Sequence, residues 1–144
     1  MKFLIAHRGN MNGINHNKEN HPEYIKAALS KGYYVEIDVW KINSELFLGH
    51  DKPQYKISKE FLQNEKLWCH AKNIEALSFM KDNNIHCFFH NNDDYTLTSR
   101  GYIWAYIGKE VDKNTICVLP EKNEQKIDFN NCLGICSDYI CLYS

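Results

Sequence analysis

At 144 residues the chain is long enough for a single domain, 1–144, and its hydrophobic fraction of 44% is sufficient for a buried core. Lysine and arginine together number 17 against 18 acidic residues, without a basic block or stripe, which argues against a nucleic-acid partner. The apolar run FLIA near the N-terminus is too short for a secretory signal, and no stretch approaches the roughly 18 apolar residues of a membrane helix. We therefore expect a cytoplasmic protein without membrane insertion.

Short apolar runs rich in β-branched and aromatic residues recur along the chain between polar breaks, and they predict strands. In chain order they read FLIAH, YYVEIDVW, ELFLGH, LWCHAK, IHCFFH, YIWAYIG, TICVLP and LGICSDYI. The segment 91–101, NNDDYTLTSRG, concentrates turn-forming residues and predicts a loop over the mouth of the fold.

Two helices are predicted between the earlier strands. The segment 20–32 has Asn20 as an N-cap, Pro22 in the first turn and a glycine at its end. The segment 73–84 begins at Asn73 and repeats apolar residues at helical spacing. Alternation of strands with helices predicts a mainly parallel α/β fold.

The faces of the predicted strands refine this fold. In YYVEIDVW, Glu36 and Asp38 point to one side, whereas Val35, Ile37 and Val39 point to the other. Later strands likewise oppose an aliphatic face to a face of imidazoles and aromatic rings. Helices outside and a polar interior near the strand ends are typical of a barrel, although a regular barrel takes about 250 residues. The sequence therefore predicts a compact, trimmed or incomplete TIM-type (β/α) barrel with short later helices.

The six cysteines lie at positions 69, 87, 117, 132, 136 and 141. The first three stand inside apolar runs, where a thiol behaves as a small buried hydrophobe. The last three lack the paired C-x2-C spacing of structural zinc sites. Reduced structural thiols are the preferred interpretation.

Four short polar elements fall at or just beyond predicted strand ends: His7-Arg8-Gly9, Glu19-Asn20, Glu36-x-Asp38 and His50-Asp51. Each alone is compatible with ordinary packing or surface pairing. Two carboxylates on one inward strand face are costly, however, unless a positive charge lies between them. A hard divalent cation, Mg2+ or Ca2+, is the simplest partner because it takes oxygen ligands.

The stretch HRGN…KENHPEYIKAALSKGYYVEIDVW…LFLGHD, over residues 5–51, resembles the glycerophosphodiester phosphodiesterase family. That family belongs to the superfamily that includes phosphatidylinositol-specific phospholipase C. Its HRG strand end, Glu-Asn element, helix ending in glycine, E-x-D strand and His-Asp hairpin all have counterparts here, in order. The tail GICSDY also resembles the family's last barrel strand, G-I-x-[TS]-D.

The resemblance implies roles that agree with the chemistry of the side chains. His7 and His50 would be the general acid and base, in an order that the sequence leaves open. Arg8 would hold a phosphate oxygen through its guanidinium group, and Lys72 would add a second positive contact. Gly9 would let the backbone approach the ligand closely.

The same resemblance implies a metal held by Glu36 and Asp38, with His70 or Glu19 completing its ligands. The family's third strand usually carries E-x-K, whose glutamate binds the metal, but here the motif reads His70-Ala71-Lys72. Histidine is softer than carboxylate, so this departure shifts the expected preference from Mg2+ or Ca2+ toward Mn2+ or Zn2+.

These features predict a metal-dependent phosphodiesterase that hydrolyses a small glycerophosphodiester-like substrate, with a cyclic phosphate as a candidate intermediate. One alternative is a phospholipase C-type lyase that releases a cyclic phosphate. The other is a non-catalytic module that binds a phosphorylated ligand, although two histidines are more than simple phosphate binding needs. Coverage of an exposed edge by a second copy, giving a homodimer, is a further hypothesis.

Overall fold

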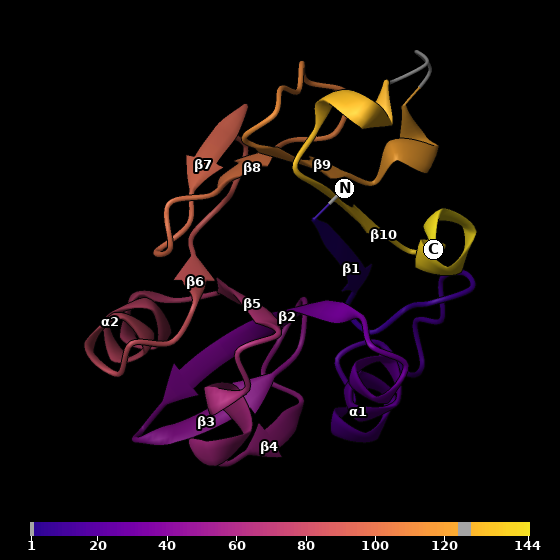
Figure 1. The fold of residues 1–144 in the computed structure, drawn as a ribbon. Helices are drawn as coiled ribbons and strands as arrows, with labels where there is room; N and C mark the ends of the chain where they lie inside the picture. The colour runs from indigo at the N-terminus through magenta and orange to yellow at the C-terminus, as the bar shows by residue number, and fades with distance from the viewer. Residues whose placement is uncertain (1, 124–127) are drawn as a thin grey trace.

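The computed structural model describes residues 2–123 and 128–144, which form one curled mixed sheet and two α-helices (Figure 1). The strands are β1 (Phe3–His7), β2 (Tyr34–Ile42), β3 (Glu45–Leu48), β4 (Tyr55–Ile57), β5 (Leu67–Ala71), β6 (Cys87–Phe88), β7 (Tyr95–Leu97), β8 (Ile103–Ala105), β9 (Thr115–Val118) and β10 (Gly134–Ser137). The helices are α1 (Pro22–Ser30) and α2 (Ile74–Asp82), and 3-10 turns cover Glu60–Gln63, Pro120–Lys122, Phe129–Asn131 and Ile140–Tyr143. No helix in these ranges is long and apolar enough to cross a membrane.

Most of the sheet is parallel. Neighbouring strands pair in parallel in the order β6-β5-β2-β1-β10-β9-β8. β3 pairs antiparallel with the end of β2, β4 pairs antiparallel with β3, and β7 pairs antiparallel with β8. Because parallel strands end at one edge of a sheet, the polar residues that close β1, β2 and β5 come together there.

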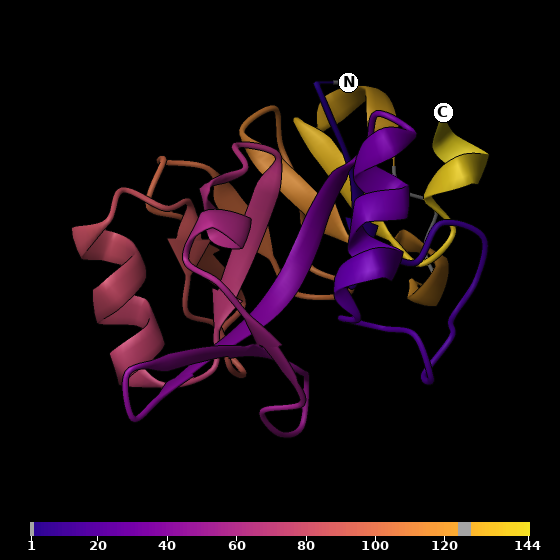
Figure 2. The same cartoon turned by 90° about the horizontal axis from the view of Figure 1, so that it is seen from below.

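The prediction of a trimmed TIM-type barrel is wrong. The sheet curls only into a half-barrel (Figure 2), and in the described part of the chain α-helices follow only β1 and β5. One physical reason is the shortness of two later connections. Residues 89–94 join β6 to β7 and residues 106–114 join β8 to β9, and both are shorter than the dozen or so residues of a helical crossover.

Side chains alternate between the two faces of the sheet as the strand patterns predicted. On the outer face, aliphatic residues such as Val35 and Ile37 join the core that includes Ile25 of α1. On the inner face, Trp68 packs against Trp104, with 5.8 Å between their ring centres, in a mainly aromatic cluster. All six cysteines are free and five are buried, with one exposed near the C-terminus. The curled sheet thus separates two buried clusters, an aliphatic one on its outer face and a mainly aromatic one on its inner face.

The two predicted helices form, but the first begins one residue later than expected. His21, not Asn20, is the N-cap of α1, and its ring accepts a hydrogen bond from the N–H of Glu23 at 3.1 Å. Asn20 has a left-handed backbone, with φ of 65°, and turns its amide toward β2 instead. Helix α2 begins as predicted, with Asn73 capping its first turn.

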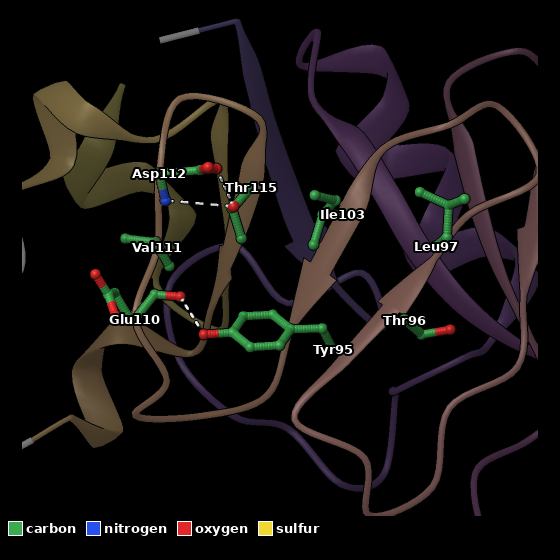
Figure 3. A pocket seen from close by; sticks show the side chains of 8 residues that line it. All are labelled: Tyr95, Thr96, Leu97, Ile103, Glu110, Val111, Asp112 and Thr115. Carbon is green, nitrogen blue, oxygen red and sulfur yellow. Dashed lines mark hydrogen bonds between the residues drawn. The ribbon is translucent and has the colours of Figure 1, made fainter.

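The outer face of β7 and β8 carries a shallow hollow of about 460 Å³ (Figure 3). Its lining consists of Tyr95, Thr96, Leu97, Ile103, Glu110, Val111, Asp112 and Thr115. The Tyr95 hydroxyl donates to the carbonyl oxygen of Glu110 at 2.8 Å, and Leu97 is 66% exposed. The lining contains neither histidine nor cysteine, so this hollow lacks the chemistry of the cavity described next.

Candidate functional site

A cavity of about 450 Å³ opens at the C-terminal ends of the parallel strands. Every residue predicted to act on a substrate or a metal lines it: His7, Arg8, Glu19, Glu36, Asp38, His50, His70 and Lys72. Apolar lining comes from β8, β9 and the residues that follow them, including Trp104, Tyr106 and Leu119. The structure therefore gathers residues far apart in the sequence around one space.

The turn after β1 places Arg8 beside this space. Its backbone is left-handed at Arg8 (φ 54°) and Gly9 (φ 87°), and the N–H of Arg8 donates to the carbonyl oxygen of Glu36 at 2.9 Å. A Cβ on Gly9 would lie 2.8 Å from Cδ2 of Tyr24. The glycine is thus required where the turn packs on α1, whereas the sequence suggested an approach to the ligand.

Three side chains come together as a possible set of metal ligands. Glu36 and Asp38 extend from β2, and His70 lies opposite Asp38 in the neighbouring strand β5. One potential ligand atom from each residue lies within 4.8 Å of the others. His70 Nδ1 is 3.3 Å from Asp38 Oδ1 and 4.0 Å from Glu36 Oε1. Two carboxylates and an imidazole form a donor set suited to a divalent cation.

The orientation of His70 is fixed by its other ring nitrogen. Nε2 donates to the carbonyl oxygen of His90 at 2.8 Å, and the ring stacks on Phe88 with 5.1 Å between ring centres. Because Nε2 is held by the carbonyl oxygen, Nδ1 is the ring nitrogen that faces the two carboxylates, where it can either donate to Asp38 or bind a cation. Metal-binding histidines typically have such a carbonyl partner, which sets both tautomer and ring orientation.

The two carboxylates differ in their surroundings. Burial acts to raise the pKa of Asp38, but hydrogen bonding and charge from His70, together with Arg8 and Asn20, hold it well below its usual range. Asn20 donates to Asp38 Oδ2 at 2.9 Å and accepts from the Asp38 N–H at 3.0 Å. Burial, and then the charge of Asp38, raise the pKa of Glu36. Asp38 is therefore the better stabilised anion.

Two buried polar atoms in this cluster lack a hydrogen-bond partner among the described residues: Glu36 Oε2 and Arg8 Nε. A buried carboxylate oxygen without a donor normally costs stability. A cation bound by Glu36, Asp38 and His70 would supply positive charge to this buried carboxylate. The residues present therefore fit a divalent metal.

Glu19 lies at the edge of the cluster and pairs with Arg8. Its Oε2 accepts from Arg8 Nη1 at 3.1 Å, and its Oε1 accepts from Asn10 Nδ2 at 3.0 Å. The sequence left His70 and Glu19 as alternatives for the third metal ligand. In the structure His70 lies beside the two carboxylates, whereas Glu19 is paired with Arg8. Glu19 thereby fixes the guanidinium group, which also lies 3.4 Å from Asp38.

His7 forms a dyad with Asp138, a residue that the sequence analysis did not assign to the site. Its Nδ1 donates to Asp138 Oδ1 at 2.7 Å, and its Nε2 lies 3.7 Å from Glu36 Oε2. Burial lowers the pKa of His7, but the hydrogen bond to Asp138 and the charge of Glu36 outweigh it and give a net rise. Asp138 is the aspartate of the motif GICSDY, so the resemblance of that motif to the family's last strand could have identified it as a site residue.

His50 and Lys72 complete the predicted set at the margin of the cavity. His50 is 43% exposed, and its Nδ1 is hydrogen-bonded to Asp51 Oδ1 at 2.8 Å. In both predicted acid–base histidines Nδ1 is therefore hydrogen-bonded to a carboxylate, and Nε2 makes no hydrogen bond to the residues that the structure describes. Lys72 is half-buried and forms no salt bridge with a described carboxylate, which leaves its charge available to an anion.

Comparison of the chain with protein-family models, with curated proteins and with solved structures gives no match. The resemblance to glycerophosphodiester phosphodiesterases consequently depends on the quoted motifs, and the function is inferred from the residues of the cavity.

Proposed function

We propose that the protein is a metal-dependent phosphodiesterase that hydrolyses a small glycerophosphodiester-like substrate with His7 and His50 as acid–base catalysts. The observation that carries this proposal is the convergence of Glu36, Asp38 and His70 beside His7 and Arg8. A simple phosphate-binding pocket would need the cations but not the carboxylates or the two histidine–carboxylate dyads.

The charge of the cavity favours an anionic substrate once a divalent cation is bound. The lining carries four carboxylates and three permanent cations, and a divalent cation would change their formal sum from −1 to +1. The histidine that acts as general acid adds a further positive charge. The residues counted are Glu19, Glu36, Asp38, Asp138, Arg8, Lys72 and Lys122.

The proposed reaction needs one proton accepted and one proton donated. Either His7 or His50 takes the proton of the attacking hydroxyl at Nε2, and the other gives a proton to the oxygen of the departing alcohol. A bond from the attacking oxygen to phosphorus forms as the bond to that alcohol breaks. Attack by a neighbouring hydroxyl of the substrate yields a cyclic phosphate, and attack by water yields an open monoester.

Arg8 and Lys72 are the residues proposed to hold the phosphoryl oxygens. Glu19 and Asp38 keep the Arg8 guanidinium in place, which reduces the entropy lost when substrate binds. When a divalent cation is bound, it offsets negative charge on the phosphoryl oxygens.

Phosphorus NMR of a mixture of glycerophosphodiesters incubated with the protein tests the proposal. The incubations contain Mg2+, Ca2+, Mn2+ or chelator, and the variants are His7→Ala, His50→Ala and, as a matched control, His21→Asn, which lies outside the cavity and keeps a capping side chain on α1. We expect consumption that requires metal, His7 and His50 but not His21. A cyclic phosphate as the final product would favour the lyase. Tight diester binding without turnover would favour the binding module and contradict the proposal.

A further inference from the structure

A second pocket lies at the opposite end of the strands from the candidate active site. Its volume is about 440 Å³, within the range of small-molecule sites. We call it the basal pocket and define it by its lining: Lys2, Phe3, Tyr34, Glu65, Lys66, Trp68, His86, Arg100 and Tyr102. Phe3 and Tyr34 begin β1 and β2, and Tyr102 directly precedes β8, so the pocket lies where these parallel strands start. None of its residues lines the candidate active site.

Aromatic rings form the walls of the basal pocket. Tyr34 and Tyr102 each meet Phe3 edge-on, at 5.0 Å between ring centres, and both tyrosines are partly exposed. Trp68 packs behind them, 5.2 Å from Phe3, and is almost fully buried. Two partly exposed tyrosine rings on either side of a phenylalanine present apolar surface to the edge or face of a planar ligand.

Three cations line the basal pocket without a carboxylate partner among the described residues, and two of them lie over its rings. Lys2 Nζ lies 5.1 Å from the ring centre of Phe3, and Lys66 Nζ lies 5.8 Å from that of Tyr34. Arg100 donates to the backbone carbonyl oxygen of Glu65 at 3.3 Å. Among the described residues none of these three cations forms a salt bridge with a carboxylate, although one carboxylate, Glu65, also lines the pocket. The pocket thus has an excess of positive charge.

A buried histidine adds polarity without adding charge. His86 is 4% exposed, its Nε2 is hydrogen-bonded to Thr98 Oγ1 at 2.9 Å, and its ring centre lies 4.4 Å from that of Trp68. Burial and the charge of Arg100 lower the pKa of His86 to about 4, so the imidazole is neutral at physiological pH. The proposed phosphodiesterase chemistry uses neither this histidine nor the cations near it.

We propose that the basal pocket binds a small anion that carries a planar ring, with the anionic group among Lys2, Lys66 and Arg100 and the ring against Tyr34 and Tyr102. An aryl phosphate and an aromatic carboxylate share this chemistry. The three cations recognise the charge, and the tyrosine rings recognise the planar group. An anion without a ring, or a ring without a charge, uses only one half of the pocket.

Isothermal titration with phenyl phosphate and with benzoate tests this proposal, and it does not depend on turnover. Inorganic phosphate and benzyl alcohol are the matched probes that lack the ring and the charge, and the titrations are run in chelator. We expect the better of the two aromatic anions to bind at least ~10-fold more tightly than either matched probe. This ratio corresponds to about 1.4 kcal/mol of binding free energy. Preference for phenyl phosphate over benzoate, or the reverse, identifies the anionic group.

The variants separate this pocket from the candidate active site. The double variant Lys66→Gln, Arg100→Gln is expected to weaken the aromatic anion at least ~10-fold, whereas Lys72→Gln leaves its affinity unchanged. Arg100 is exposed and Lys66 is half-buried, so circular dichroism checks that the fold is retained. Equal affinity in the double variant, or no measurable binding of either aromatic anion, would overturn the proposal. Loss only in Lys72→Gln would assign the binding to the active-site cavity and also overturn it.

Discussion

Replacement of Glu36 by glutamine is the sharpest test of the metal site, because it removes one charge and nearly preserves side-chain volume. In the metal-free protein, burial and the neighbouring charge of Asp38 raise the pKa of Glu36, so its ionised form is unfavourable. Its Oε2 also has no hydrogen-bond partner among the described residues. We therefore expect metal-free Glu36→Gln to be at least as stable as the wild type.

When metal is present, we expect the wild type to be more stable than Glu36→Gln. A cation at 100 times its Kd stabilises the native state by about 2.7 kcal/mol, which at about 4 °C per kcal/mol raises Tm by about 10 °C for a domain of this size. The wild type is expected to show this rise, and Glu36→Gln to lose most of it. The assay is thermal unfolding followed by circular dichroism across a metal titration, with Glu75→Gln on the exposed face of α2 as the control.

Three results would count against this reasoning. An equal rise of Tm in Glu36→Gln and the wild type would place the cation outside the cluster of Glu36, Asp38 and His70. No rise in the wild type with Mg2+, Ca2+, Mn2+ or Zn2+ would remove the metal from the proposed function altogether. A lower Tm of the metal-free variant would show that Glu36 is held by interactions other than those described.

Three further predictions concern the catalytic dyads and the turn after β1. His7→Ala and His50→Ala should each lower turnover by ~10²–10⁴-fold while circular dichroism stays unchanged, and near-normal turnover in both would exclude the acid–base assignment. Asp138→Asn removes the negative charge that strengthens the hydrogen bond to His7 and raises its pKa, so the NMR titration of that ring should move to lower pH; an unmoved titration would contradict the dyad. Gly9→Ala forces a Cβ to within 2.8 Å of Tyr24 at a φ of 87°, and should lower the free energy of unfolding by ~1–3 kcal/mol in urea titrations; an unchanged midpoint would contradict the packing argument.

The parts of the fold that the sequence predicted are those set by local pattern. Period-two alternation in YYVEIDVW correctly placed Glu36 and Asp38 on one face and Ile37 on the other. The inner, polar face of the parallel sheet then had to collect the residues at its strand ends, so the grouping of the candidate site was also accessible.

The parts that were missed depend on contacts between distant segments. Asp138 meets His7 across 131 positions, and no periodicity of either segment encodes that contact. Asn20 was predicted to be the N-cap of the first helix, but its side-chain amide is hydrogen-bonded to Asp38 on β2. His21 is the N-cap instead. The prediction of a barrel was wrong for the same reason. Whether a sheet closes depends on whether its connections supply helices that cover its outer face. The strand β7 was predicted as loop because its three residues stand among turn-formers, and it forms only by pairing with β8.

His86 makes a prediction about acid stability that is independent of catalysis. Its pKa is about 4 in the folded protein, lowered by burial and by Arg100 from an ordinary value of 6.5. The unfolded chain therefore binds the proton more readily, and the stability associated with neutral His86 is present above pH 6.5 and is lost as the pH falls toward 4. One such group changes the free energy of unfolding by at most about 1.4 kcal/mol per pH unit.

His7 and Glu36 act in the opposite direction over part of this range, because their pKa values are raised in the folded protein. The informative quantity is consequently the difference between the wild type and His86→Gln, measured by urea unfolding from pH 7.5 to pH 4. Relative to the wild type, the variant should gain stability as the pH falls, since it lacks the group that must be protonated on unfolding. A flat difference for His86→Gln would mean that His86 titrates normally in the folded state, and the buried, neutral imidazole assigned to the basal pocket would have to be abandoned.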